Sequence, residues 1–153
     1  MGEVNMSIMV VKKEFKLVGL KGIGEFVNFG NEVPLLAKQL LSRSNEILNP
    51  IETEIALYEP KKDEGHKVGH YYVGLIVSEK LYEVPSGMDY METNKSYITT
   101  RGNISKLEEL HLSLLNWAVK QGYQRDLDSY IVETYHPIGE GEEEVQIYLP
   151  IQT

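Results

Sequence analysis

Two short patterns occur twice in this chain of 153 residues, at nearly the same separation. Tyr58-Glu59-Pro60 matches Tyr135-His136-Pro137 at an offset of 77 residues, and Tyr71-Tyr72-Val73-Gly74-Leu75 matches Ile147-Tyr148-Leu149-Pro150-Ile151 at an offset of 76. Offsets this similar indicate an internal duplication. Two such units can pair about a pseudo-two-fold axis and leave a cleft between them, so the duplication predicts a site at the middle of the molecule.

Each half of the chain is predicted to contain a strand, a helix and two further strands. The strands are expected at residues 7–19, 53–58, 70–78, 95–101, 129–136 and 145–151, and the helices at 31–48 and 104–121. Val84 to Gly87 is the expected boundary between the halves. We therefore predict a single α+β domain over residues 1–153, built from duplicated strand-helix-strand-strand units at about residues 7–80 and 88–151. Pseudo-two-fold symmetry would give an antiparallel sheet with two helices and a central groove.

Local signals predict where several elements begin and end. Gly22 and Gly24 are expected to break the first strand. Pro34 fits the first turn of the first helix, where a missing N–H costs nothing. Ser105 and Glu108 have the spacing of a capping box at the start of the second helix, and Gly122 suits its C-terminal end.

The charge balance limits the partners of the chain. The net charge of −8 repels phosphate backbones, and the sequence has no cluster of Lys and Arg to overcome it, so no direct nucleic-acid binding is expected. The opening residues Met1 to Met9 are too polar and acidic for a signal peptide, and no stretch approaches the ~18 apolar residues that a membrane span needs. We therefore expect a cytoplasmic protein without a membrane partner.

The sequence predicts neither a metal nor a cofactor. Cysteine is absent, which excludes thiolate catalysis and sulfur-ligated metals. His66 and His70 are four residues apart but lack an evident third ligand, so surface histidines are favoured over a zinc site. The glycines between Gly19 and Gly24 match neither a dinucleotide-binding motif nor a P-loop.

Tyrosine dominates the aromatic residues, with 10 tyrosines against 3 phenylalanines. Tyrosine walls offer an aromatic surface together with a hydroxyl group. Ordinary strand packing explains any single tyrosine, and only the convergence of several in one cleft favours a binding site. Those on or beside predicted strands are Tyr58, Tyr71, Tyr72, Tyr97, Tyr130, Tyr135 and Tyr148.

Glu133 lies in the middle of a predicted strand, on the same face as Ile131 and Tyr135 by strand alternation. It either faces water, the commoner outcome for a glutamate, or is buried at a cost that a cation or hydrogen-bond donors must offset. Trp117, the only tryptophan, lies on the second predicted helix, where core packing and ligand stacking predict the same spacing.

Several segments, taken in order, resemble the GyrI-like small-molecule-binding domains, which also occur as effector-binding domains of AraC- and MerR-type regulators. The segments are Phe15 to Gly19, Ile47 to Asn49, Tyr71 to Val77, Val84 to Met88, Tyr97 with Arg101-Gly102, Trp117, Glu133 with Tyr135, and Ile147 to Ile151. They span nearly the whole chain. No helix-turn-helix precedes them, so the chain resembles the stand-alone version of this domain rather than a complete transcription regulator.

The resemblance implies a central groove in which a glutamate among aromatic residues receives lipophilic cations. Glu133 matches that glutamate, and Trp117 matches a helix tryptophan of the groove. The expected ligand-binding residues are Glu133, Trp117, Tyr72, Tyr97, Tyr135 and Tyr148. The leading expectation is a binding module of the multidrug-binding type, which senses or sequesters a small, aromatic organic cation without catalysis.

Two alternatives stay open at this point. Some GyrI-like proteins are hydrolases that open strained rings of toxic natural products. In such an enzyme Glu133 would act as the general base while Tyr97 polarises the substrate. Other relatives bind and modulate a topoisomerase, and the acidic composition is compatible with a protein partner, although the sequence identifies none.

Overall fold

The computed structural model describes residues 7–48 and 50–153, and its elements follow the duplicated order that the sequence predicts. The elements are β1 (Met9–Glu25), η1 (Phe26–Asn28), α1 (Phe29–Leu41), η2 (Ser44–Glu46), β2 (Pro50–Tyr58), β3 (Val68–Val77), β4 (Asp89–Asn103), η3 (Ile104–Lys106), α2 (Leu107–Gln121), β5 (Ile131–Gly139) and β6 (Glu142–Pro150). Most of the segment in which a signal peptide was considered, residues 1–6, lies outside the described residues. None of the described helices has the length and apolar character to cross a bilayer.

The strands form a closed antiparallel barrel in the order β1-β3-β2-β5-β6-β4. The two halves meet at two places, where β2 pairs with β5 and β1 pairs with β4. Each of these pairs joins equivalent strands, as a pseudo-two-fold axis requires. Ala56 and Glu133, which differ by the repeat offset of 77 residues, are direct Cα partners. The axis therefore passes between them. The predicted α+β class and duplicated antiparallel arrangement are confirmed.

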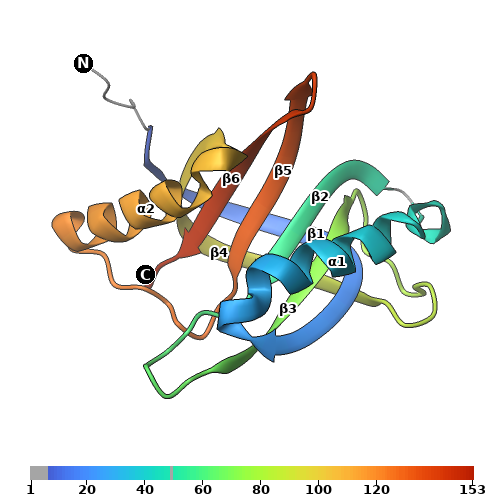
Figure 1. Cartoon of the computed structure of the whole chain (residues 1–153), viewed down its shortest axis with the longest axis horizontal. Helices are drawn as coiled ribbons and strands as arrows, with labels where there is room; N and C mark the ends of the chain where they lie inside the picture. The colour runs from blue at the N-terminus through green and yellow to red at the C-terminus, as the bar shows by residue number, and fades with distance from the viewer. Residues whose placement is uncertain (1–6, 49) are drawn as a thin grey trace.

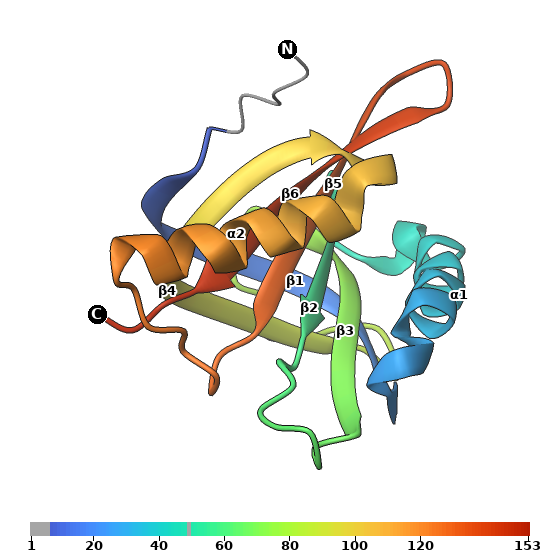
Figure 2. The ribbon, with the colours of Figure 1, turned by 60° about the vertical axis from the view of Figure 1, so that its left-hand side comes forward.

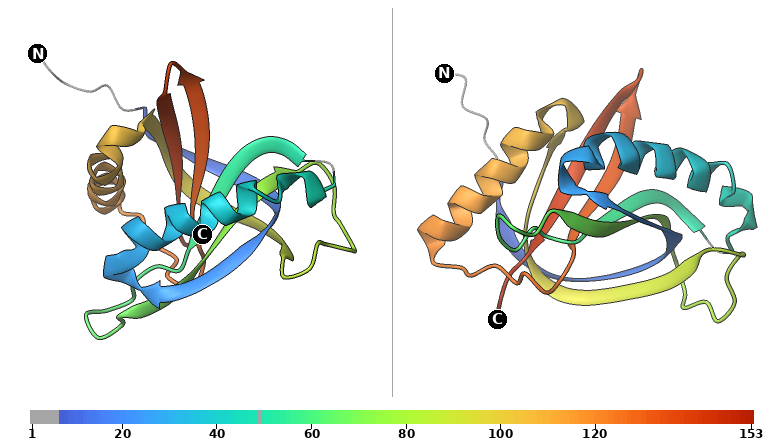
Figure 3. Two further views of the ribbon diagram at one scale, coloured as in Figure 1. Left: turned by 45° about the vertical axis from the view of Figure 1, so that its right-hand side comes forward. Right: turned by 60° about the horizontal axis from the view of Figure 1, so that its bottom comes forward.

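The two helices pack on the outer face of the barrel, and the β5–β6 hairpin rises between them (Figure 1, Figure 3). Under α1, Val33 and Leu40 pack with Val73 of β3. Under α2, Leu110 and Leu114 pack with Ile147 of β6. Figure 2 shows both helices beside the strands that they cover. Burial of these apolar stripes fixes each helix against its own half of the molecule.

A third apolar cluster fills the interior of the barrel. Strand alternation turns Tyr72, Tyr97 and Tyr148 inward, whereas their sequence neighbours face the helices. Phe15 of β1 lies edge-on to Tyr148, with ring centroids 4.9 Å apart. Both faces of the sheet are consequently buried over much of its area.

The expected strand break at Gly22 and Gly24 is wrong, because β1 continues through both residues to Glu25. A Cβ atom at Gly22 would lie 2.3 Å from the ring of Tyr71, and one at Gly24 would lie 2.2 Å from the carboxylate of Glu32. These glycines therefore permit the close approach of neighbouring side chains rather than a turn.

Some predicted helix ends also need correction. The helix α1 ends at Leu41, not at residue 48, and Pro34 lies beyond its first turn. Ser105 does not form the expected capping box, since its backbone N–H donates to the Asn103 side chain at 2.9 Å. Gly122 does end α2, with a φ of 79° in the left-handed region.

Candidate functional site

A cavity of about 390 Å³ lies between α1, the start of α2 and the central strands β2 and β5. This volume is in the range of small-molecule sites, and most of the lining residues are apolar. The cavity is lined by Phe29, Gly30, Val33, Pro34, Ala37, Lys38, Leu40, Leu41, Glu54, Ile55, Ala56, Tyr58, Val73, Gly74, Ile104, Leu107, Glu133, Tyr135 and Glu143. The predicted groove between the halves is thus a cavity beside the pseudo-two-fold axis.

Glu133 is the buried carboxylate of this cavity, with only 4% of its surface exposed. Its Oε1 accepts from the hydroxyl of Tyr135 at 2.6 Å and from that of Tyr58 at 3.0 Å. The two hydroxyl oxygens lie 2.9 Å apart. Each phenol has one proton to donate, so the two phenols can form only two of these three hydrogen bonds at a time. Tyr58 and Tyr135 are repeat counterparts, and the duplication brings them together at one carboxylate oxygen.

His111 of α2 contacts the other oxygen of the same carboxylate. Its Nε2 lies 2.7 Å from Oε2 of Glu133, and 28% of the imidazole side chain is exposed. Sequence reasoning missed this residue. The available signal was its spacing of four residues from Leu107, which places both on one face of α2.

Burial raises the pKa of both phenols well above the usual value. For Tyr58 the loss of hydration is the largest cause and the nearby Glu133 carboxylate is the next. For Tyr135 the loss of hydration is again largest, followed by the neighbouring Tyr58 and Glu133. Both phenols therefore stay protonated at neutral pH and donate to the carboxylate.

Two further carboxylates, Glu54 and Glu143, line the cavity with Lys38 of α1. Burial and the neighbouring Glu143 raise the pKa of the half-buried Glu54. Phe29 of α1 stacks on Tyr58, with ring centroids 6.1 Å apart and planes at 29°. The site consequently combines carboxylates with an aromatic wall that the first half of the chain supplies.

Of the residues expected to bind the ligand, Glu133 and Tyr135 line this cavity. Tyr72, Tyr97 and Tyr148 lie instead on the opposite face of the sheet, inside the barrel, where Tyr97 is fully buried. Their position follows from strand alternation, because the adjacent residues face the helices. A ligand-binding role for these three tyrosines stays a prediction.

Trp117 lies beyond the part of α2 that borders the cavity. The cavity reaches η3 and the first residue of α2 through Ile104 and Leu107, whereas Trp117 stacks on Tyr123 near the C-terminal end of the helix. The ring centroids are 5.7 Å apart with planes at 14°. The structure does not bring Trp117 to Glu133, and its predicted role in stacking stays a prediction.

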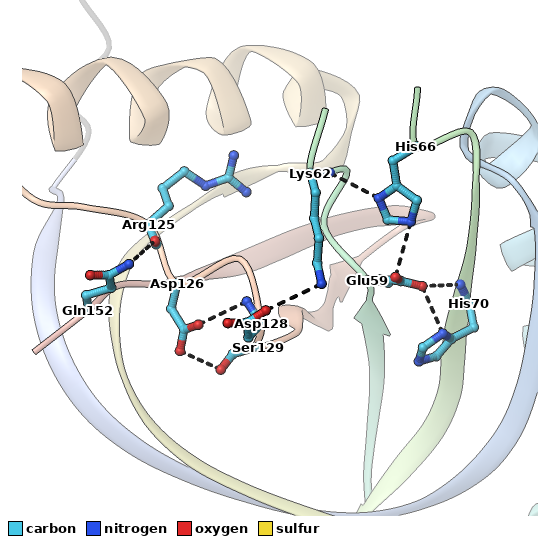
Figure 4. A network of polar contacts seen from close by, with 9 residues as sticks. All are labelled: Glu59, Lys62, His66, His70, Arg125, Asp126, Asp128, Ser129 and Gln152. Atoms are coloured by element: carbon cyan, nitrogen blue, oxygen red, sulfur yellow. Dashed lines mark hydrogen bonds and ion pairs between the residues drawn. The ribbon is translucent and has the colours of Figure 1, made fainter. Parts of the chain in front are cut away.

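His66 and His70 belong to a separate polar network, which Figure 4 shows. His66 Nε2 lies 3.2 Å from Oε2 of Glu59, and His70 Nδ1 lies 2.9 Å from Oε1 of the same residue. The other imidazole nitrogen of His70 contacts the hydroxyl of Tyr130 at 2.6 Å. Among the described residues, no group of three metal-ligating side chains is arranged to hold a metal ion.

Comparison with known proteins gives structural relatives only. No protein-family model and no curated protein matches the chain. The C-terminal domain of EcmrR superposes with a TM-score of 0.71 at 14% identity, covering 98% of this chain and 99% of that domain. A Vibrio cholerae integron cassette protein has a TM-score of 0.61 at 10% identity, covering 97% of this chain and 100% of that protein.

A hydrolase of Listeria innocua has a TM-score of 0.60 at 10% identity, covering 95% of this chain and 91% of that one. At identities this low, structural similarity shows a shared fold and no more. The chain therefore has the GyrI-like fold, as the resemblance of its sequence to GyrI-like domains implied.

Proposed function

We propose that the chain binds a small organic cation with an apolar body in the cavity between α1 and the central strands. The observation that supports this most strongly is Glu133, a carboxylate with 4% of its surface exposed, at the wall of a mostly apolar cavity. A buried carboxylate is retained only where donors or a cation offset its lost hydration. A ligand with a delocalised positive charge would match this surface.

The walls of the cavity suit the apolar part of such a ligand. Phe29 and Tyr58 offer stacked rings on one side, and Val33, Ala37 and Leu40 of α1 offer aliphatic surface. An aromatic face beside a cation contributes about 0.5–2 kcal/mol. Together with the apolar contacts and one carboxylate, this is enough for micromolar affinity without chemistry. The GyrI-like fold, shared with the EcmrR C-terminal domain, is consistent with an effector-binding or sequestering role.

A titration with tetraphenylphosphonium tests the proposal. The substitution Glu133→Gln keeps the shape of the side chain and removes its charge. We expect Glu133→Gln to weaken binding by about 1–3 kcal/mol, which is about 5- to 150-fold in Kd, because the charge pair is shielded from water. Isothermal calorimetry measures both affinities directly.

Glu54→Gln provides the matched control, because Glu54 lines the same cavity and is only half-buried. It should weaken binding less than Glu133→Gln, since water screens a partly exposed charge. Triphenylphosphine oxide, a neutral analogue, should bind wild type and Glu133→Gln equally. Equal affinity of tetraphenylphosphonium for wild type and Glu133→Gln would refute the role of the Glu133 charge.

Hydrolysis is a second candidate, favoured by the two phenol protons beside the carboxylate and by solved hydrolases that share the fold. In such a reaction Glu133 accepts a proton from water as the water oxygen bonds to an electrophilic carbon. The bond to the leaving group breaks, and the phenol of Tyr58 or Tyr135 donates the proton that this group takes up. The proton held by Glu133 then passes to the phenolate, which restores both groups. Tyr97, expected in this role from the sequence, lies on the other face of the sheet.

Turnover distinguishes the two candidates. An electrophile with a strained three-membered ring is incubated with the wild type and with Glu133→Gln, and mass spectrometry detects addition of water. Product from the wild type alone would establish hydrolysis, whereas stoichiometric binding without product would establish a receptor.

A further inference from the structure

Glu133 already has a basic partner within the protein. His111 Nε2 lies 2.7 Å from Oε2, while the phenols of Tyr58 and Tyr135 contact Oε1. The phenols are neutral donors, so among these three partners only the imidazole can bring a positive charge to the carboxylate. The charge state of His111 therefore determines whether Glu133 is neutralised before a ligand arrives.

The surroundings of His111 make Glu133 its main electrostatic partner. On α2 the residues one helical turn away are Leu107, Glu108, Leu114 and Leu115, of which Glu108 is charged and exposed to water. Toward the sheet it contacts Oε2 of Glu133, whose other carboxylate oxygen accepts from the phenols of Tyr58 and Tyr135. Besides Glu133, the charged groups on the cavity wall are Lys38, Glu54 and Glu143. With 28% of its side chain exposed, the imidazole can exchange protons with solvent.

We propose that protonated His111 competes with the cationic ligand for the carboxylate of Glu133, an inference that rests on the cation-binding function proposed above. A cation binds when His111 is neutral, and its binding releases a proton from the imidazole. Neutral His111 still donates its Nε2–H to Oε2, which keeps the carboxylate oriented and charged. Protonated His111 cancels that charge and repels a second cation that approaches the same carboxylate.

This competition has a defined thermodynamic consequence. Because proton and ligand bind to alternative states, each lowers the affinity for the other by the same factor. When the competition is complete, the Kd of a cation rises about tenfold for each unit by which the pH falls within the range where His111 is protonated. His111 is then the residue that sets the pH range in which the cavity accepts cations.

The test measures tetraphenylphosphonium affinity between about pH 5 and pH 8, where histidine side chains ordinarily change charge. Wild type should bind more tightly as pH rises. His111→Gln, whose amide can still donate to Glu133 but cannot be protonated, should lose much less affinity at low pH than wild type. The titration of Glu54, whose pKa burial raises, remains in both proteins. The difference between them therefore isolates His111.

His66→Gln is the matched control, because His66 lies in the separate network around Glu59. It should leave the pH profile of binding unchanged. Calorimetry of the wild type in two buffers of different ionisation enthalpy gives an independent measurement, which does not need a variant. It should detect release of up to about one proton per cation bound at the acidic end of the range.

Two results would overturn the inference while leaving the binding function intact. One is cation binding that depends on Glu133 but not on pH and releases no proton. The other is the same pH profile in wild type and His111→Gln. Absence of cation binding at every pH would overturn the proposed function, and this inference with it.

Discussion

The two phenols at Glu133 predict a cooperative contribution to stability. Removing the Tyr135 hydroxyl leaves Tyr58 to donate to Oε1, and removing the Tyr58 hydroxyl leaves Tyr135 in place. The other contact, between the two hydroxyl groups, disappears in either single variant. Each single substitution by Phe therefore removes one of two phenol protons but leaves the buried carboxylate oxygen with a donor.

The magnitudes follow from this arrangement. Tyr58→Phe and Tyr135→Phe should each lower the free energy of unfolding by about 1 kcal/mol, the typical value of a single intramolecular hydrogen bond. The double variant leaves Oε1 of Glu133 buried without a phenol donor and loses a hydrogen bond to a charged group, which costs about 1.5–3 kcal/mol more. We therefore expect a total loss of about 2.5–4 kcal/mol, larger than the sum of about 2 kcal/mol for the single variants.

Urea denaturation of wild type, both single variants and the double variant measures this coupling. The phenyl rings stay in place, so the apolar packing against Phe29 is retained in all four proteins. A double variant that loses only the sum of the single losses would show that the two hydroxyl groups act independently, and would refute the shared carboxylate.

Two further predictions concern the backbone and the alkaline range. Gly19→Ala should destabilise the fold by about 3 kcal/mol or more, because its Cβ would lie 2.1 Å from a backbone oxygen of β3. Gly30→Ala should stabilise the fold by about 0.5–1 kcal/mol, because the added Cβ would enter open space at a helical position of α1. Thermal denaturation measures both changes. The raised pKa values of Tyr58 and Tyr135 give stability that is fully present below about pH 10 and is lost as pH rises through the folded-state pKa values. The free energy of unfolding should therefore fall more steeply above about pH 10 in wild type than in the double Phe variant, and equal slopes would contradict the burial of these phenols.

The repeat explains why so much of the fold and the centre of the site could be predicted. Tyr58 and Tyr135 occupy matching positions in the two halves, and they come together because β2 and β5 pair at the pseudo-two-fold axis. Strand alternation then places Glu133 on the face of Tyr135. These inferences depend only on local periodicity and on the repeat offset, both of which are present in the sequence.

The remaining features depend on long-range packing. In a closed barrel with helices outside, both faces of a strand are buried, so alternation did not reveal whether Tyr97 and Tyr148 face the cavity or the barrel interior. The glycine at position 22 is explained by the ring of Tyr71, which lies 49 residues away in sequence. His111 reaches Glu133 because of how α2 lies on the sheet, which helical spacing alone does not specify.

A crystal structure with tetraphenylarsonium measures the position of a bound cation most directly, because the anomalous signal of arsenic locates the centre of charge. The account predicts the arsenic in the cavity between α1 and β5, with the carboxylate of Glu133 facing it. Arsenic in the barrel interior beside Tyr97 and Tyr148, or only on the outer surface, would contradict it.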